Sequence, residues 1–287
     1  MSLSLCVLGS GSGGNCTLLM VQEKRRARHI LIDCGLSLRE TRRRLGPLGL
    51  DLGDIDDILL THLDWDHFSP PWANVLERHE ITLHVHHRHR SPALRAGVPG
   101  SRLAMFNGGF ALGDSTTVES IHLAHDELGT VGFIIEHDGR RLGFATDLGR
   151  VPDALFASFR ELHALAFESN YDRDMQLSSG RPAFLKKRIM GGAGHLSNVQ
   201  SFEAVRRIAA ESKLAHVILL HLSRQCNDPR IIARLYARHA PDLLDRLTIT
   251  CQFEPTPVLR VHLRGRRGRR GRPVALRPGE QLSMFGV

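Results

Sequence analysis

Residues 59–67 read LLTHLDWDH, so that an apolar run is followed within six residues by His62, Asp64, Asp66 and His67. The run at 57–62 is typical of a buried strand. Imidazole and carboxylate groups on a loop that follows a rigid strand can point into one cleft and hold a divalent ion. The alternative is a solvated polar loop, but two histidines and two aspartates at a strand end favour a metal site.

Apolar runs rich in β-forming residues surround this stretch, and four segments with helical periodicity separate them into groups. Consecutive strands grouped in this way favour layered sheets covered by helices over a regular alternation of strand and helix. Asn198 and Asp228 are predicted N-caps, and Asp138-Gly139 is predicted to turn a hairpin. The strands are expected at 4–9, 16–21, 29–33, 57–62, 81–86, 117–125, 131–136, 141–147, 163–168, 216–221, 247–251 and 257–263, and the helices at 37–45, 152–162, 199–213 and 229–239.

The composition indicates a globular protein with a substantial core. The 287 residues are 42% hydrophobic and 24% charged, which is ordinary for such a protein. No apolar run approaches the roughly 20 residues that span a bilayer, and no signal-peptide pattern opens the chain, so we expect a cytoplasmic protein without a membrane partner. The five cysteines are scattered and never spaced as CxxC, which excludes a disulfide framework or a cysteine zinc site.

Positive charge is concentrated at the carboxyl end. The formal net charge is +8, yet residues 260–287 hold eight arginines and a single acid, so the preceding chain is almost neutral. We therefore expect a folded domain at 1–263 and a flexible Arg/Gly-rich tail at 264–287. A solubilising tail is the alternative, but guanidinium groups bind phosphate bidentately and favour contact with nucleic acid. The arginines concerned are Arg264, Arg266, Arg267, Arg269, Arg270 and Arg272.

Two other motifs are interpreted as carrying no site. Residues 9–14, GSGSGG, satisfy the GxGxxG pattern of dinucleotide-binding proteins, but the following segment has the pattern of a strand and not of the helix that such a site requires. The histidine tract at 84–89 has no interleaved acid or cysteine, and we expect it at a surface-facing edge.

Taken together, an ordered series of motifs resembles the metallo-β-lactamase fold, and within it the YycJ/WalJ branch of metal-dependent nucleic-acid hydrolases, 5′→3′ exonucleases that act on double-stranded DNA. The resemblance covers about residues 3–252 and implies an α+β fold, a four-layer αββα sandwich. The motifs lie at 9–15, 32–35, 61–67, 124–126, 145–149, 168–172, 194–198 and 221–223.

This resemblance also implies a ligand set for two divalent ions. His62 and His125 are expected to hold the first ion, with Asp64 at a position where the family has histidine. His122 lies on the same predicted strand as His125 and is an alternative ligand. The second ion is expected on Asp66, His67 and His221, with Asp147 bridging the two ions.

Asp64 changes the charge and the chemistry of this set. The three carboxylates carry a total charge of −3, whereas two divalent ions carry +4. These carboxylates belong to Asp64, Asp66 and Asp147. Carboxylate is a harder ligand than imidazole and shifts the preference from zinc toward manganese or iron. Two metal ions are expected, and the alternatives are a weakened first site or a single occupied site.

The resemblance implies hydrolysis of a DNA phosphodiester by a hydroxide held between the metal ions, in DNA repair or replication. Asp66, Asp147 and His195 are the expected catalytic residues, and Glu168 is expected to orient its neighbours. The expected substrate-binding residues are Asn170, His195, Ser197 and Asn198. The alternatives are an endoribonuclease similar to tRNase Z, a hydrolase of small lactones or thioesters, and a DNA-binding module that lacks metal. The sequence does not specify the oligomeric state.

A short segment near the carboxyl end suggests a protein partner. Gln281, Leu282, Met284 and Phe285 resemble the QLxLF peptide by which bacterial replication proteins bind the sliding clamp. Their apolar side chains are suited to a groove, and a flexible tether allows a short peptide to reach it. The alternative is a chain end without a partner.

Overall fold

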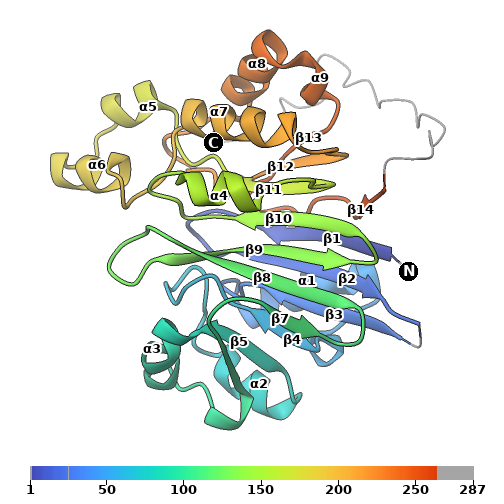
Figure 1. The fold of residues 1–287 in the computed structure, drawn as a ribbon. Coiled ribbons are helices and arrows are strands. Elements are labelled where there is room, and N and C mark those ends of the chain that lie inside the picture. Colours follow the sequence, from blue (N-terminus) through green and yellow to red (C-terminus); the bar gives the residue numbers. More distant parts are fainter. Residues whose placement is uncertain (1, 25, 264–287) are drawn as a thin grey trace.

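The computed structural model describes residues 2–24 and 26–263, which fold into two seven-stranded sheets (Figure 1). The first sheet has the order β14-β1-β2-β3-β4-β5-β6, and the second has the order β13-β12-β11-β10-β9-β8-β7. The strands of the first sheet are β1 (Ser2–Gly9), β2 (Cys16–Gln22), β3 (Ala27–Ile32), β4 (Asp57–Leu59), β5 (Thr82–His86), β6 (Leu103–Phe106) and β14 (Leu259–Val261). Those of the second are β7 (Phe110–Leu112), β8 (Thr116–Leu123), β9 (Thr130–His137), β10 (Arg140–Ala145), β11 (Ala164–Glu168), β12 (His216–Leu220) and β13 (Leu247–Ile249).

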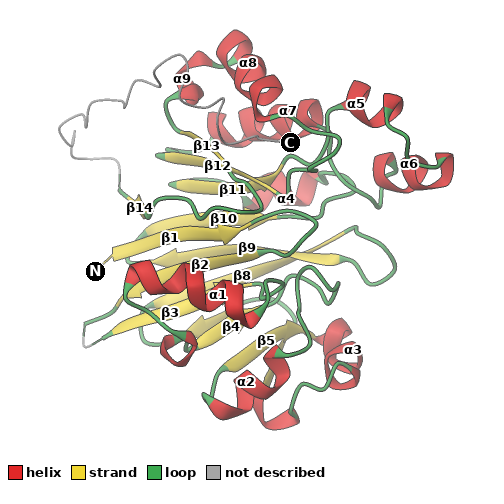
Figure 2. Cartoon of the chain, turned by 180° about the vertical axis from the view of Figure 1, so that it is seen from behind, coloured by secondary structure: helices red, strands yellow, loops and turns green. Residues whose placement is uncertain are grey.

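Three buried apolar clusters show that the sheets and helices form four layers. The middle cluster joins residues of both sheets, among them Leu5 and Phe133, so the sheets pack face to face. A second cluster packs Trp72 and its helix on the outer face of the first sheet, and a third packs Val205 and its helix on the outer face of the second. Figure 2 shows α1 on the outer side of β2 and β3. The structure thereby confirms the predicted α+β, four-layer αββα sandwich.

Helices cover both outer faces of the sandwich. On the side of the first sheet lie α1 (Leu38–Leu45), α2 (Trp72–Arg78) and α3 (Arg90–Arg95). With the second sheet lie α4 (Asp153–Ser158), α5 (Arg173–Ser178), α6 (Ala183–Met190), α7 (Asn198–Ala210), α8 (Pro229–His239) and α9 (Pro241–Leu244). Both views show α5 and α6 projecting from one end of the molecule (Figures 1 and 2). The longest described helix, α7, has 13 residues, and no helix of the described chain is long and apolar enough to cross a bilayer.

The carboxyl ends of several strands meet at one edge of the sandwich. In the first sheet, β3, β4 and β5 run parallel. In the second, β10, β11 and β12 run parallel, and β8 shares their direction because both β8 and β10 pair antiparallel with β9. A hydrogen bond from the Val131 N–H to the Thr61 carbonyl (3.1 Å) joins the two sheets at this edge. Side chains that follow these strands are therefore brought together.

Local predictions from the sequence are confirmed in part. Asp228 caps α8 and accepts from the Arg230 N–H, and Asp138-Gly139 turns the hairpin between β9 and β10 with positive φ at both residues. The predicted N-cap Asn198 is wrong: Ser197 caps α7, since its hydroxyl accepts from the Gln200 N–H in a capping box. The glycine-rich segment at 9–14 joins two antiparallel strands, β1 and β2, as expected.

The histidine tract does not lie at a surface-facing edge. The strand ends at His86, residues 87–89 form a 3₁₀ turn, and both His86 and His89 are buried. The tail at 264–287, with its arginines and the candidate clamp-binding residues, lies outside the described residues, and the domain boundary at 263 stays a prediction.

Candidate metal centre

The loop after β4 folds into a tight turn that is fixed from two sides. The Asp64 carbonyl accepts from the N–H groups of His67 (2.8 Å) and Phe68 (2.9 Å). The Asp66 carbonyl accepts from the Asn15 N–H (2.7 Å). A Cβ on Gly35 would overlap that carbonyl oxygen, so only glycine permits this close approach of backbone to backbone.

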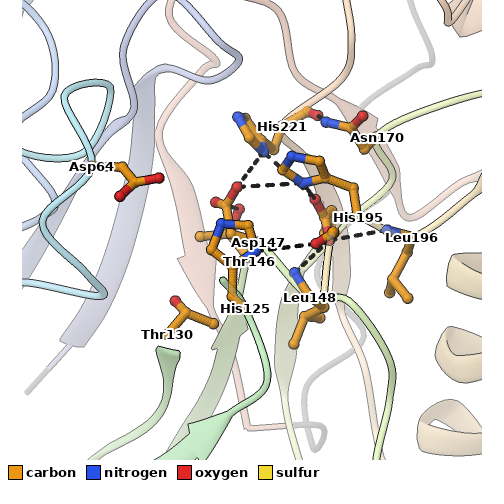
Figure 3. A network of polar contacts seen from close by, with 12 residues as sticks. Asp64, His125, Thr130, Thr146, Asp147, Leu148, Asn170, His195, Leu196 and His221 are labelled. Carbon is orange, nitrogen blue, oxygen red and sulfur yellow. Dashed lines mark hydrogen bonds and ion pairs between the residues drawn. The ribbon is translucent and has the colours of Figure 1, made fainter. Parts of the chain in front are cut away.

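The structure brings all seven predicted metal ligands into one cluster, and five of them line a cleft: Asp64, Asp66, His125, Asp147 and His221. Four groups of side chains each place their ligand atoms within 4.8 Å of one another. The three groups made up only of predicted ligands share members: His62, Asp64 and His125; Asp66, His67 and His221; and His62, His67 and Asp147. The fourth group joins Asp147 and His221 to Glu168 and His195. Asp147 therefore lies between the sets expected for the first and the second ion, and Figure 3 shows it facing His195 and His221.

His125 rather than His122 faces the cluster. The His125 Nδ1–H donates to the Gly194 carbonyl (3.1 Å), and its ring centroid lies 5.0 Å from that of His62. The His122 Nε2–H donates to the Leu128 carbonyl (2.8 Å), and His122 belongs to none of the ligand groups among the described residues. The geometry thus favours His125 as the ligand of the first site.

Three residues at this edge adopt left-handed backbone conformations. The φ angles are 61° at Asp33, 56° at Asp147 and 56° at His221, and each residue lies within two positions of the end of a strand. Aspartate and histidine enter this region more readily than most residues, but it still costs energy and is concentrated at functional sites. The strained turns direct these side chains to the cleft floor.

Charge balance in the buried cluster fits a divalent cation. Burial lowers the pKa of His62 well below its usual value and keeps this imidazole neutral. Burial also opposes the charge on His67, but the carboxylates of Asp147 (3.0 Å) and Asp33 (2.8 Å) outweigh it and hold the His67 pKa well above its usual value. Conversely, the pKa of buried Asp147 lies well below its usual value because His221 and His67 outweigh the burial. The buried carboxylates therefore need cations to balance their charge. Bound metal ions can provide this charge while the imidazoles stay neutral.

His221 gives a second indication that the residues fit a metal. Its Nδ1 lies 2.8 Å from an Asp147 carboxylate oxygen, yet within the described chain neither of its ring nitrogens has a hydrogen-bond partner of acceptable geometry. Buried polar atoms are nearly always hydrogen-bonded or bound to an ion or water. Imidazole and carboxylate groups that converge without hydrogen-bonding are expected where both coordinate a cation.

His195 lines the cleft beside the ligands and is held by a buried carboxylate. Its Nδ1 lies 2.7 Å from Glu168 Oε1, and Glu168 also accepts from the backbone N–H groups of Leu148 (2.7 Å) and Leu196 (3.4 Å). Asn170 lines the same cleft and donates to the His221 carbonyl (2.8 Å). Glu168 therefore fixes the imidazole of His195 through Nδ1, which leaves Nε2 for contact with a ligand in the cleft.

Ser197 and Asn198, both predicted to bind substrate, lie outside the cleft. Ser197 caps α7. Asn198 is buried; its side chain bonds to Ser169 and Asn227, and its backbone N–H donates to the Tyr171 carbonyl (2.8 Å). The polar groups of Asn198 are thus used within the fold.

Asp33 is the functional residue to which the sequence analysis gave no role. Its carboxylate accepts from the Thr61 N–H (2.8 Å) and the Thr61 hydroxyl (2.9 Å), besides its contact with His67. Hydrogen bonds of this kind orient a ligating imidazole and fix its tautomer. The signal in the sequence was an aspartate directly after an apolar strand, at 29–33.

A sandwich of two sheets with a histidine–aspartate cluster at its strand ends defines a metal-dependent hydrolase of the metallo-β-lactamase fold. The chain belongs to the protein family described as the β-lactamase superfamily domain, and the model of this family matches residues 28–222.

Individual relatives agree with this assignment. The chain is 29% identical over 243 residues to an exodeoxyribonuclease YycJ of Bacillus anthracis, covering 82% of this chain and 88% of that protein. It is 27% identical over 227 residues to an exodeoxyribonuclease WalJ of Streptococcus pneumoniae, covering 77% and 82%. Among solved structures, the metallo-β-lactamase fold protein YhfI from Bacillus subtilis has a TM-score of 0.67 at 13% identity, covering 91% of this chain and 100% of that one. The short form of human tRNase Z has a TM-score of 0.59 at 16% identity, also covering 91% and 100%. These two structures show the shared fold.

Replacing Asp64 by histidine should change the metal preference. The Asp64→His protein is expected to bind zinc more tightly relative to manganese, because an imidazole replaces a hard oxygen ligand beside His62 and His125. The measurement is the zinc-to-manganese ratio in protein equilibrated with both ions. Asp153→His, an exposed change at the start of α4, is the control. An unchanged ratio would show that residue 64 does not bind the metal.

Proposed function

We propose that the protein is a metal-dependent phosphodiesterase of the cytoplasm that degrades DNA from the 5′ end, with a role in DNA repair or replication. The observation that carries the proposal is the cluster of seven candidate metal ligands, five of which line a cleft beside a fixed imidazole, His195. The exodeoxyribonucleases among its relatives support the choice of DNA as substrate.

The residues of the cleft divide the chemistry among them. His62, Asp64 and His125 would hold one ion, Asp66, His67 and His221 the other, and Asp147 would contact both. When bound, zinc, manganese or iron ions supply a nucleophilic water at neutral pH and positive charge for the phosphate oxygens. His195 can donate a proton to the leaving oxygen, and Glu168 holds its ring in position for that step. Asn170 lines the same cleft and would contact a bound substrate.

The test is a nuclease assay on matched substrates. Purified protein with added manganese or zinc is incubated with a DNA duplex labelled at either end, the same sequence as RNA, and a covalently closed circular DNA. We expect mononucleotides from the 5′ end of linear DNA and no cleavage of the circle. Three outcomes would contradict the proposal. Cleavage of RNA alone would indicate an endoribonuclease, and cleavage of lactones or thioesters alone would indicate a small-molecule hydrolase. A purified protein that binds no metal would indicate a DNA-binding module.

We further propose that the tail arginines bind the DNA backbone. Deleting residues 264–287 should leave cleavage of short substrates at low salt intact but should weaken the salt dependence of binding. On duplex DNA, each phosphate that a protein neutralises contributes about 0.9 to the slope of log K against log salt. The measurement is a binding titration at several salt concentrations. An unchanged slope would show that the tail does not touch the DNA.

A second proposal for the tail is that Gln281, Leu282, Met284 and Phe285 bind the bacterial sliding clamp. Such binding would retain the enzyme on DNA by raising its effective concentration. A peptide covering 276–287 should bind the clamp of the same organism saturably. The matched control peptide has alanine at Gln281, Leu282 and Phe285 and should not bind. Equal binding of the two peptides, or no binding of either, would exclude clamp docking.

A further inference from the structure

One wall of the cleft carries an exposed tryptophan. Trp65 lies between the candidate ligands Asp64 and Asp66, lines the cleft, and is 67% exposed. The other tryptophan of the chain, Trp72, is fully buried in the core. The hydrogen-bonded turn at 64–68 fixes the backbone on both sides of Trp65. An aromatic face is therefore held at the mouth of the cleft, next to the metal centre.

A helix without a buried residue borders the same cleft. None of the residues of α6 is buried, and Phe184 at its start is 74% exposed. Leu185, Arg188 and Ile189 line the cleft. Helix α6 therefore presents apolar and cationic side chains to a ligand in the cleft.

Arg181, just before α6, has no carboxylate partner in the part of the chain that the structure describes. In this part its guanidinium donates to neutral oxygens, those of Gln176 (3.1 Å), Gln225 (3.3 Å) and Ser223 (3.4 Å). Within the described residues it forms no ion pair, whereas Arg188 pairs with Asp126 at 2.6 Å. A guanidinium that is oriented but unneutralised is suited to bidentate binding of a phosphate.

The depth of the metal centre limits which form of nucleic acid can reach it. Asp147 and His221 are almost fully buried and line a cleft of about 460 Å³. His62 and His67 are buried in the same ligand cluster without lining the cleft. Trp65 and Arg181 both line this cleft. A phosphodiester can reach the floor only when its strand enters the cleft, which a base-paired end resists.

We propose that the cleft takes the end of the nucleic acid as an unpaired strand. Trp65 stacks on the base next to the scissile phosphate, and Arg181 binds a neighbouring phosphate. Every base has a π-face, so this recognition is independent of sequence. The inference rests on the proposed function. It adds that the enzyme binds the DNA end as a single strand.

Tryptophan fluorescence provides a direct binding test without catalysis. Full-length protein in EDTA is titrated with a 12-nucleotide oligo(dT), and the quenching of Trp65 is measured. Trp65→Phe supplies the background from Trp72 and keeps an aromatic face; its affinity, measured by anisotropy of labelled oligonucleotide, should stay within about threefold. Trp65→Leu keeps apolar bulk without a π-face and should bind about 5- to 150-fold more weakly.

The second arm tests Arg181. Arg181→Gln should lower the salt slope of single-strand binding by about 0.7, which corresponds to one phosphate contact. Arg160→Gln, which removes an exposed arginine paired with Glu211, is the matched control and should leave the slope unchanged. Met105→Ala, at another exposed apolar side chain, is the control for Trp65→Leu.

The third arm compares cleavage of blunt duplexes with duplexes whose last two 5′ nucleotides are unpaired. Unpaired ends should be cleaved at least about tenfold faster, because each base-pair step to be opened costs on average a factor of about ten. If the wild type cleaves DNA but neither Trp65→Leu nor Arg181→Gln changes binding, the inference is wrong and the proposed function stands. If oligonucleotide quenches Trp65 as expected but no nucleic acid is cleaved with any metal, the proposed function is wrong.

Discussion

An Asp147→Asn protein should fold normally and hydrolyse its substrate at least about 10³-fold more slowly than the wild type. Asparagine enters the left-handed region as readily as aspartate, so the turn after β10 is retained. The amide, however, removes the anionic oxygens that lie between His67 and His221. Bound metal supplies several kcal/mol of charge stabilisation in the transition state, and each 1.36 kcal/mol corresponds to a factor of ten.

The measurement is the kcat of both proteins at saturating manganese, together with thermal melting in EDTA to show that the fold is intact. Asp153→Asn, an exposed aspartate at the start of α4, is the matched control and should keep wild-type activity. If Asp147→Asn cleaved DNA at a rate near that of the wild type, the assignment of Asp147 as a ligand would be wrong.

An Asp33→Asn protein should lose about 10- to 100-fold in metal affinity, which is the range for losing a partner that orients a ligand. Asp33 supplies the anionic oxygens that accept from His67 and Thr61, and a single amide oxygen cannot replace them. The left-handed backbone at residue 33 again tolerates asparagine. The ligand His67 would therefore be present but poorly oriented.

Calorimetric titration of metal-free protein with manganese measures this loss. Asp56→Asn is the control, because Asp56, between β3 and β4, pairs with the exposed Arg26 and does not line the cleft. Equal affinities of Asp33→Asn and the wild type would mean that the contact between Asp33 and His67 is unimportant for binding.

The fold and the ligand set were predicted from the ordered series of motifs that resembles the metallo-β-lactamase fold, and local patterns support them. Asp147 and His221 lie within two residues of the end of an apolar strand, which is visible in the sequence alone. The role of Asp33 was not predictable in this way, since it depends on β3 and β4 being parallel neighbours, a pairing that no local pattern encodes.

The helices and strands that were not predicted from the sequence are short or bury few residues, so their hydrophobic periodicity is weak. The strands β6 and β7 are only four and three residues long and lie at the far edges of the two sheets. Helix α6 buries nothing and so shows no apolar period, and yet it borders the cleft. Ser197 and Asn198 are both good caps, and only the reciprocal bond with Gln200 decides between them.

The pairing of β14 with β1 has a consequence for shortened forms of the protein. Strand β1 is buried along almost its whole length, and in the described chain its outer edge pairs with residues 259–261, while the Thr256 N–H donates to the Val7 carbonyl (2.9 Å) beside them. An apolar strand with an open edge is a template for pairing with other chains. A protein truncated before residue 256 would therefore expose this edge and should self-associate.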